Sequence, residues 1–534
     1  MKEASRKQTF LHGAALLAMA TAIVKIIGAF YKIPLKMIIG DQGYGYFVTA
    51  YDIYSVLLMI CTAGLPIAMS RMISQASSVG NYNQVRRVYG TARAIFLSLG
   101  AISTLLMMCF SHQLAAFQKQ PDAWAAIFCL GPCGLLMCVM STYRGFFQGQ
   151  GNMRPTSNSQ ILEAGYKLVI GLALAYGVMR ATNSVSLAAG AAILGVTVSC
   201  LVSAIYLNRQ QRPAYRELPA TDDTPLSYKQ TAGQLLAIAV PITIGSAGLQ
   251  VLTVIETNLY MGQLLTANGM SQQTADITKG IYNMTQTVFN MPCAFMVPIT
   301  TSVLPAITAQ LTTGNLKGVK ATEESAARIT GLISLPCAVG LSILATPVMG
   351  LLGGYTGENL ALAGTILTIL GINVFFYGMI QYTNVVLQSH GYAHIPVINT
   401  LLCGAMKLIV VYLLVGNPQI GIVGAPIGML LCYLCIGVLN LIAINRVVPQ
   451  KARLLRNILR PAIPAALMGG GVWGVYRILI ALLGANGSRV LLCGIPVCVG
   501  VVIYGVCIAV FKAIRREDCL LLPKGEKIAN FLHL

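Results

Sequence analysis

The sequence predicts an all-α protein that crosses a membrane about fourteen times, on the evidence of composition and of recurring apolar stretches. Of its 534 residues, 56% are hydrophobic and 10% are charged, and the mean hydropathy is +0.71. A soluble protein carries roughly a quarter charged residues. Each apolar stretch of about 20 residues suffices to cross a hydrocarbon core of about 30 Å. The chain is therefore expected to be a polytopic helical membrane protein.

The candidate spans follow one another along nearly the whole chain. They lie near residues 11–34, 46–69, 88–110, 123–147, 158–179, 185–207, 232–258, 279–307, 327–352, 360–388, 394–415, 420–444, 457–483 and 488–512. The first is too long for a cleavable signal, carries Lys25 and leads directly into further spans. We therefore expect it to be a membrane span.

The net charge of +20 is distributed as in a membrane protein. Most of the 36 Lys and Arg residues fall in alternate loops and at the two ends, and this bias places such loops on the cytoplasmic side. We therefore predict a cell-membrane protein with both termini cytoplasmic. The bias also favours contact with anionic inner-leaflet lipid. It requires no nucleic acid, and none is expected as a partner.

Enzyme signals are absent from the sequence. The 15 cysteines fall almost entirely within spans, where cysteine packs as a small residue. There is no phosphate-binding loop and no HExxH motif. We therefore expect no enzymatic activity, catalytic residue, metal or cofactor. Any transport would be driven by an ion gradient, the membrane potential or downhill flux.

An internal duplication organises the chain. "GNYNQVRR" at 80–87 recurs as "GNLKGVKA" at 314–321, and "LPIAMS" at 65–70 recurs as "VPITTS" at 297–302. Gln148, Gly151 and Lys167 likewise recur as Gln388, Gly391 and Lys407, in the same order. The predicted divisions are an N-terminal lobe (1–207), a cytoplasmic linker (208–231), a C-terminal lobe (232–446), and two additional spans with a basic tail (447–534).

Six spans per lobe is an even number, so both lobes enter the membrane from the same side and form parallel repeats. Transporters built in this way bind substrate between the repeats and alternate access by rocking one against the other. We expect this chain to do so as a monomer.

Two lysines on the first span raise the question of function. Lys25 and Lys32 are seven residues apart, so they share one helix face about 10 Å apart along the axis. A charge at bilayer depth costs about 2.5–3.5 kcal/mol on insertion scales. Lys32 is either an interfacial anchor or a ligand, because a lysine near the interface can extend its ammonium into it. Lys25 either pairs with an acid, Asp52 or Glu256, or faces a watery cavity and attracts an anion.

Each of the other charges within the spans could belong either to a structural ion pair or to a functional site. Glu163 and Lys167 stand four residues apart in the favourable order for a helical ion pair, so the sequence favours a structural pair. Lys407 has Cys403 at the position corresponding to Glu163, which makes a cavity role more plausible for it. Asp52 and Glu256 could neutralise a lysine or carry a proton or cation. The candidate substrate-binding residues are therefore Lys25, Lys32, Lys407, Asp52 and Glu256.

The opening segments "KIIGAFYKIPL", "GDQGYGYF" and "AYDIYSVLLMICTAGLPIAMSRMIS" carry a family resemblance. They resemble stage V sporulation protein B-like exporters of the multidrug/oligosaccharidyl-lipid/polysaccharide superfamily, which are similar to lipid II flippases. The resemblance covers essentially the whole chain. It implies a V-shaped flippase with a cationic central cavity, and Lys25 falls where such flippases place a basic residue on the first span.

The implied substrate is an undecaprenyl-pyrophosphate-linked oligosaccharide or peptidoglycan precursor, moved from the inner to the outer leaflet. Lysine suits a phosphate as a compact point charge. The alternatives are a cation-coupled multidrug exporter of the same superfamily, which needs acids in its cavity, and a membrane glycosyltransferase or polymerase, against which the missing acidic motifs count.

Overall fold

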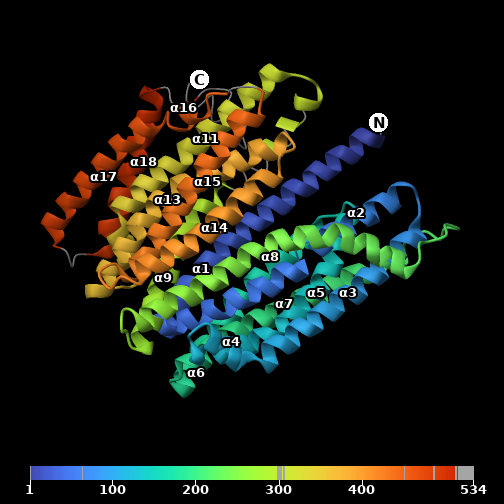
Figure 1. The fold of residues 1–534 in the computed structure, drawn as a ribbon, viewed down its shortest axis with the longest axis horizontal. Coiled ribbons are helices and arrows are strands. Elements are labelled where there is room, and N and C mark those ends of the chain that lie inside the picture. Colours follow the sequence, from blue (N-terminus) through green and yellow to red (C-terminus); the bar gives the residue numbers. More distant parts are fainter. Residues whose placement is uncertain are drawn as a thin grey trace. The chain divides into compact units, whose positions relative to one another are not determined.

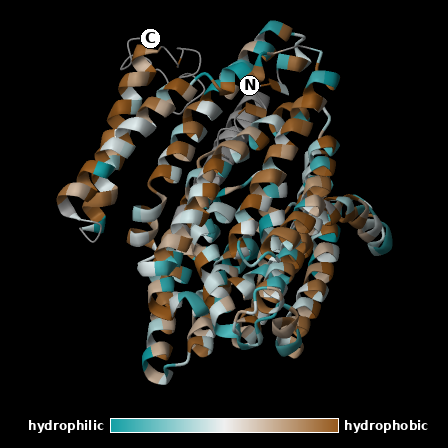
Figure 2. Ribbon diagram, turned by 60° about the vertical axis from the view of Figure 1, so that its left-hand side comes forward, coloured by the Kyte–Doolittle hydropathy of each residue, from teal (hydrophilic) through white to brown (hydrophobic). Residues whose placement is uncertain are grey.

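The computed structural model describes residues 2–62, 64–296, 303–304, 307–308, 310–449, 452–484, 488–511 and 514. Within them, side chains are described except for residues 2–19, 21–22, 25–26, 29, 245, 249 and 483. This described part is helical with connecting turns and contains no strand, which confirms the all-α prediction. Hydrophobic residues run along the long helices, as in Figure 2.

The chain forms two compact units. The first contains Met1–Leu265 and Gly269–Gly280, and the second contains Thr266–Asn268 and Ile281–Leu534. The helix α9 (Gln272–Ala294) begins in the first unit and continues in the second. Because α8 groups with the first unit, the compact units and the sequence repeats divide the chain at different places.

Nine elements build the first unit, together with the start of α9 (Figure 1). They are α1 (Lys2–Thr62), α2 (Gly64–Ser78), α3 (Tyr82–Cys109), α4 (Ser111–Phe117), η1 (Pro121–Ala123), α5 (Trp124–Gly149), α6 (Arg154–Thr182), α7 (Val185–Arg216) and α8 (Tyr228–Thr266). Helix α5 packs against both α3 and α7, and α6 packs against α7 and α1. This arrangement brings α1, α5 and α6 together around the site described below.

The described elements of the second unit, besides the end of α9, continue to Val510. They are α11 (Leu316–Ile343), α12 (Ala345–Leu352), α13 (Gly357–Ser389), α14 (His394–Val415), η2 (Gly421–Val423), α15 (Gly424–Val447), α16 (Leu454–Ile458), α17 (Ala462–Leu483) and α18 (Arg489–Val510). A buried hydrophobic cluster joins α11, α13, α15 and α16. Helices α17 and α18 pack against each other, and α17 also packs on α11.

Helix α1 contains the first two predicted spans. It is kinked at Gly40, whose backbone angles are not helical and whose φ of 69° is positive, as glycine readily allows. The rings of Tyr31 and Phe47 lie 5.9 Å apart, centroid to centroid. A straight helix would separate these positions by about 24 Å along its axis. The chain therefore folds back at Gly40, and its two arms form separate spans.

Twelve helices in the described residues are long and apolar enough to cross a membrane. The count differs from the predicted fourteen at two places. The first two predicted spans merge into the one helix kinked at Gly40. The predicted span at 279–307 extends into residues outside the described ranges. The remaining eleven predicted spans each coincide with one of these helices.

Local turns support the proposed duplication. Gly80 and Gly314 both have a positive φ, and each is followed by an asparagine at the N-cap of a 28-residue helix, α3 or α11. Gly151 and Gly391 also share a positive φ, and each precedes the next long helix. The repeated motif at 297–302 lies outside the described residues. The recurrence of turn geometry is what two copies of one ancestral unit would retain.

Candidate functional site: a cationic cavity in the first unit

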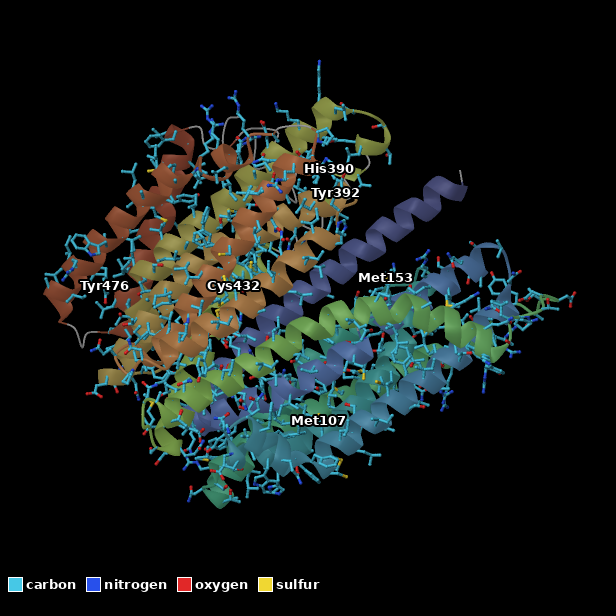
Figure 3. All side chains as sticks on the ribbon, in the orientation of Figure 1. Met107, Met153, His390, Tyr392, Cys432 and Tyr476 are labelled. Atoms are coloured by element: carbon cyan, nitrogen blue, oxygen red, sulfur yellow. The ribbon has the colours of Figure 1, made fainter. Side chains whose placement is uncertain are left out.

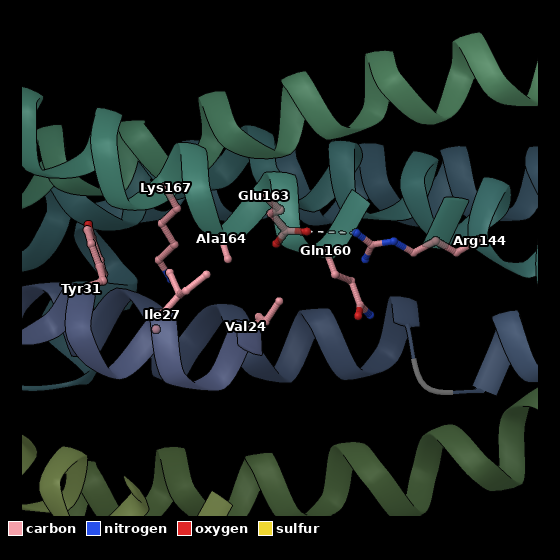
Figure 4. A pocket seen from close by; sticks show the side chains of 9 residues that line it. Val24, Ile27, Tyr31, Arg144, Gln160, Glu163, Ala164 and Lys167 are labelled. Carbon is pink, nitrogen blue, oxygen red and sulfur yellow. Dashed lines mark hydrogen bonds and ion pairs between the residues drawn. The ribbon is translucent and has the colours of Figure 1, made fainter. Parts of the chain in front are cut away.

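A cavity of about 340 Å³ lies between α1, α5 and α6, as Figure 4 shows. Its apolar side comes from α1, and its polar side from α5 and α6. It is lined by Val24, Ile27, Gly28, Tyr31, Arg144, Gln160, Glu163, Ala164 and Lys167. The Oε1 atom of Gln160 is buried and has no hydrogen-bond partner within the described residues, so it is available to a ligand or water.

The carboxylate of this cavity is neutralised from a different helix than expected. Arg144 on α5 pairs with Glu163 on α6, with 3.0 Å between Nη2 and Oε2, and its Nε donates to the Ser159 hydroxyl at 3.1 Å. The sequence favoured a pair between Glu163 and Lys167. The structure corrects this, because the guanidinium of Arg144 reaches across the helix interface and takes the carboxylate.

The Lys167 ammonium contacts neutral groups. Its ammonium donates a hydrogen bond to the Tyr51 hydroxyl at 2.8 Å and lies 4.7 Å and 5.2 Å from the ring centres of Tyr51 and Tyr31. It forms no ion pair within the part of the chain that the structure describes. Aromatic faces stabilise a cation without cancelling its charge. The cavity therefore has a net positive wall.

Three of the predicted site residues lie near one another in the first unit, and Lys32 among them lies close to this wall. Lys32 on α1 lies near both Lys167 and Asp52, so that one like and one opposite charge act on it. Asp52 accepts a hydrogen bond from Thr257 of α8 at 3.4 Å and lies near Lys279 and Glu256. Glu256 is 8% exposed on α8. The structure thus brings together Lys32, Asp52 and Glu256 within the first unit.

The other two predicted site residues are not placed at the cavity. The side chain of Lys25 lies outside the described residues, although the adjacent Val24 lines the cavity. Lys407 lies half-buried on α14, in the second unit. Their roles stay predictions.

A buried polar network in the first unit was missed by the sequence reasoning. Lys279 on α9 is fully buried and donates hydrogen bonds to Thr49 and to Gln120, the latter at 2.9 Å. Asp276, one turn earlier, accepts from Gln120 at 2.8 Å and from Tyr46 at 3.0 Å. The sequence could have indicated this network, because Asp276 and Lys279 are charged residues at or next to the start of a predicted span, and such residues are candidates for function.

The second unit contains a separate buried acid–imidazole pair. Glu323 on α11 is 1% exposed, and its Oε1 lies 3.6 Å from Nε2 of His390, which follows α13. The Nδ1 atom of His390 lies 2.9 Å from the carbonyl of Val386 and therefore carries a proton. Figure 3 labels His390 near Tyr392 at this end of α13. Within the described residues, no group of three or more His, Cys, Asp or Glu could hold a metal ion.

Solved structures share this fold. The chain matches the structure of lipid II flippase MurJ in an inward closed conformation with a TM-score of 0.69, at 13% identity over 93% of this chain and 98% of that one. It matches an inward-facing MATE family multidrug transporter of the MOP superfamily with a TM-score of 0.62, at 14% identity over 81% of this chain and 100% of that one. The fold is therefore that of MOP superfamily transporters.

Sequence comparison identifies relatives in Bacillus subtilis (strain 168). The uncharacterized membrane protein YabM is 26% identical over 97% of this chain and 96% of its own length. Stage V sporulation protein B is 23% identical over 97% and 98%, and lipid II flippase MurJ is 24% identical over 75% and 76%. These relatives confirm the resemblance inferred from the opening segments. The model of the family described as "Polysaccharide biosynthesis protein" matches residues 10–310, more than half of the chain, and this multi-pass membrane protein belongs to that family.

Proposed function

We propose that the protein is a flippase that moves an undecaprenyl-pyrophosphate-linked oligosaccharide or peptidoglycan precursor across the cytoplasmic membrane by alternating access. The observation that carries the proposal is the position of Lys167, which lines the cavity, donates a hydrogen bond to Tyr51 and forms no ion pair within the described residues. A pyrophosphate requires cations, and a lipid-linked one must meet them at membrane depth.

The nearby charges favour a multivalent anion. Lys32 and Lys167 are close enough to repel each other, and Asp52 offsets that repulsion only in part because it also lies near Lys279. Two like charges held together are relieved by an anion that contacts both. A pyrophosphate, with negative charge on two linked phosphates, has the size and charge for this task.

Each predicted site residue has a proposed role on this path. Lys25 and Lys32 contact the pyrophosphate from α1, and Lys407 does so from α14. Asp52 and Glu256 set the local charge and take up a coupling proton or cation. Both termini are cytoplasmic in this proposal, and the sequence repeats act as the moving lobes.

Substitution of Lys25 separates a ligand from a structural pair. If Lys25 contacts substrate, Lys25→Ala abolishes translocation while folded protein stays in the membrane, and Lys25→Arg retains part of the activity. If Lys25 instead pairs with Asp52 or Glu256, Lys25→Ala lowers protein levels, because a buried acid left alone is strongly destabilising. Normal translocation by well-expressed Lys25→Ala protein would overturn the ligand role.

A cation-coupled drug exporter is the second candidate. The likeness to a MATE transporter and the acids Asp52, Glu256 and Asp276 in the first unit favour it. The two candidates differ in what accumulates on depletion of the protein. A flippase leaves lipid-linked precursors at the inner leaflet, whereas an exporter leaves those pools unchanged and increases sensitivity to cationic compounds.

A further inference from the structure

A second basic pocket lies between α3 and α7, apart from the cavity described above. It has a volume of about 250 Å³ and is lined by Tyr89, Gly90, Arg93, Gln211, Arg212, Tyr215 and Arg216. All three arginines are exposed, and no acidic residue lines the pocket. Three guanidinium groups on one small hollow create a strong local attraction for an anion.

The polar groups of this pocket are largely unused. Arg212 donates a weak hydrogen bond to Asn208 at 3.3 Å, whereas Arg93 and Arg216 make no hydrogen bond or ion pair within the described residues. The hydroxyls of Tyr89 and Tyr215 likewise have no hydrogen-bond partner there. Guanidinium and phenol donors without partners are what a phosphate group requires.

Packing holds the pocket floor in place. The ring of Tyr89 lies 5.1 Å from that of Tyr215 and 5.3 Å from that of Phe146, at the end of α5. Buried aromatic contacts of this kind fix side-chain positions. The two phenols are therefore held by α3, α5 and α7 together, and the arginines surround a preformed floor.

The same face of α7 continues as an apolar stripe. Leu194, Leu201 and Ile205 are 42–46% exposed, and their spacing continues to Arg212 and Arg216 on one helix face. Helix α7 has 32 residues, which gives about 48 Å and exceeds a hydrocarbon core of about 30 Å. We therefore expect its last turns to reach the headgroup region and the stripe to lie at the depth of the acyl chains.

We propose that the pocket of Arg93, Arg212 and Arg216 binds the phosphate of an anionic membrane phospholipid, whose acyl chains lie along the stripe of α7. A free phosphate ion shares the headgroup chemistry, but it would make no use of the apolar stripe. Basic pockets between transmembrane helices at this depth bind such headgroups in other membrane proteins. This site is separate from the proposed substrate path.

The test measures lipid retention on the full-length protein. Purified protein in a neutral detergent receives equal amounts of phosphatidylglycerol and phosphatidylcholine, and native mass spectrometry counts the bound lipids. The test variant is the triple substitution Arg93→Gln, Arg212→Gln and Arg216→Gln. The matched control, Arg154→Gln, Arg209→Gln and Lys229→Gln, removes the same charge from exposed residues that do not line the pocket.

The proposal predicts that the parent protein and the control variant prefer phosphatidylglycerol, and that the test variant loses this preference by about tenfold or more. Arg→Lys substitutions at the same three positions should retain part of it, which guards against a folding defect as the cause. Equal retention by the test and control variants would overturn the proposal. If the arginines were needed to bind inorganic phosphate but not to retain lipid, the proposal that the pocket binds a phospholipid would be wrong. Because no lipid-linked glycan is used, this outcome is independent of the flippase proposal.

Discussion

The ammonium of Lys167 lies 2.8 Å from the hydroxyl of Tyr51, whereas the carboxylate of Glu163, one turn away on the same helix, pairs with Arg144. This division leaves one cation of the cavity in contact with neutral groups. Arg144 forms the ion pair with Glu163, and Lys167 forms none within the described residues.

Lys167→Gln is expected to reduce translocation strongly, because it removes a cation that forms no ion pair within the described residues while keeping a hydrogen-bond donor near Tyr51. Lys167→Arg should preserve a substantial part of the activity. The measurement is the pool of lipid-linked precursor in cells that depend on the variant, with membrane protein levels determined in parallel. Full activity in a well-expressed Lys167→Gln protein would show that the cavity charge is dispensable.

Arg144→Gln is expected to lower stability, because it leaves Glu163 partly buried without its cation. Breaking a buried pair costs about 3–5 kcal/mol, and the 25% exposure of the Glu163 side chain reduces this to about 1–3 kcal/mol. The double variant Arg144→Gln, Glu163→Gln should recover much of the loss. Thermal unfolding in detergent measures both, and a double variant no more stable than Arg144→Gln alone would contradict the pairing.

Gly280→Val should destabilise the first unit at the contact between α1 and α9. A Cβ atom at Gly280 would lie 2.0 Å from the backbone oxygen of Asp41, which cannot move as a flexible side chain could. Overpacking of this kind costs about 1–3 kcal/mol. Gly233→Val on α8 is a control, since a Cβ there meets nothing within 4 Å. Equal melting temperatures for the two variants would refute the close contact.

Asp223 in the linker anchors the start of α3. Its carboxylate accepts hydrogen bonds from the backbone amides of Asn83 and Gln84 at 3.1 Å and 2.9 Å, where a helix N-terminus favours negative charge. Desolvation opposes ionisation, but the hydrogen bonds from Thr221 and from these amides outweigh it, so the pKa of Asp223 is lowered. The linker is therefore attached most firmly when this carboxylate is ionised.

A lowered pKa gives the sign of the pH dependence. The anchoring is fully present above the unfolded value of about 3.9 and is lost as the pH falls through the lower folded pKa. At neutral pH, Asp223→Asn should speed proteolytic cleavage of the linker, and Asp222→Asn serves as a neighbouring control. Identical cleavage rates for these two variants would contradict the anchoring.

The sequence alone predicted the helical class and the positions of most spans, because apolar length is a local property. It also indicated the arms of α1, although only the contact between Tyr31 and Phe47 shows that they fold back at Gly40. The partner of Glu163 could not be predicted. The local spacing favoured Lys167, but the carboxylate pairs with the guanidinium of Arg144 on another helix.

The polar network around Lys279 of α9 could not be predicted from the sequence for a similar reason. Lys279 is stabilised by Thr49 and Gln120, which are distant in the sequence and are brought together only by packing. Among the predicted site residues, Lys32, Asp52 and Glu256 proved to lie in one unit close to further charges. Their charge and depth could be inferred from sequence, whereas their neighbours depend on tertiary contacts.

The central claim is that the protein translocates a lipid-linked glycan, and the most direct test is mass analysis of lipid-linked precursors after depletion of the protein. The account predicts that undecaprenyl-pyrophosphate-linked sugars accumulate at the inner leaflet, and that the parent protein, but not the Lys167→Gln variant, reverses the accumulation. Unchanged precursor pools in cells fully depleted of the protein and of any redundant relative would contradict the account.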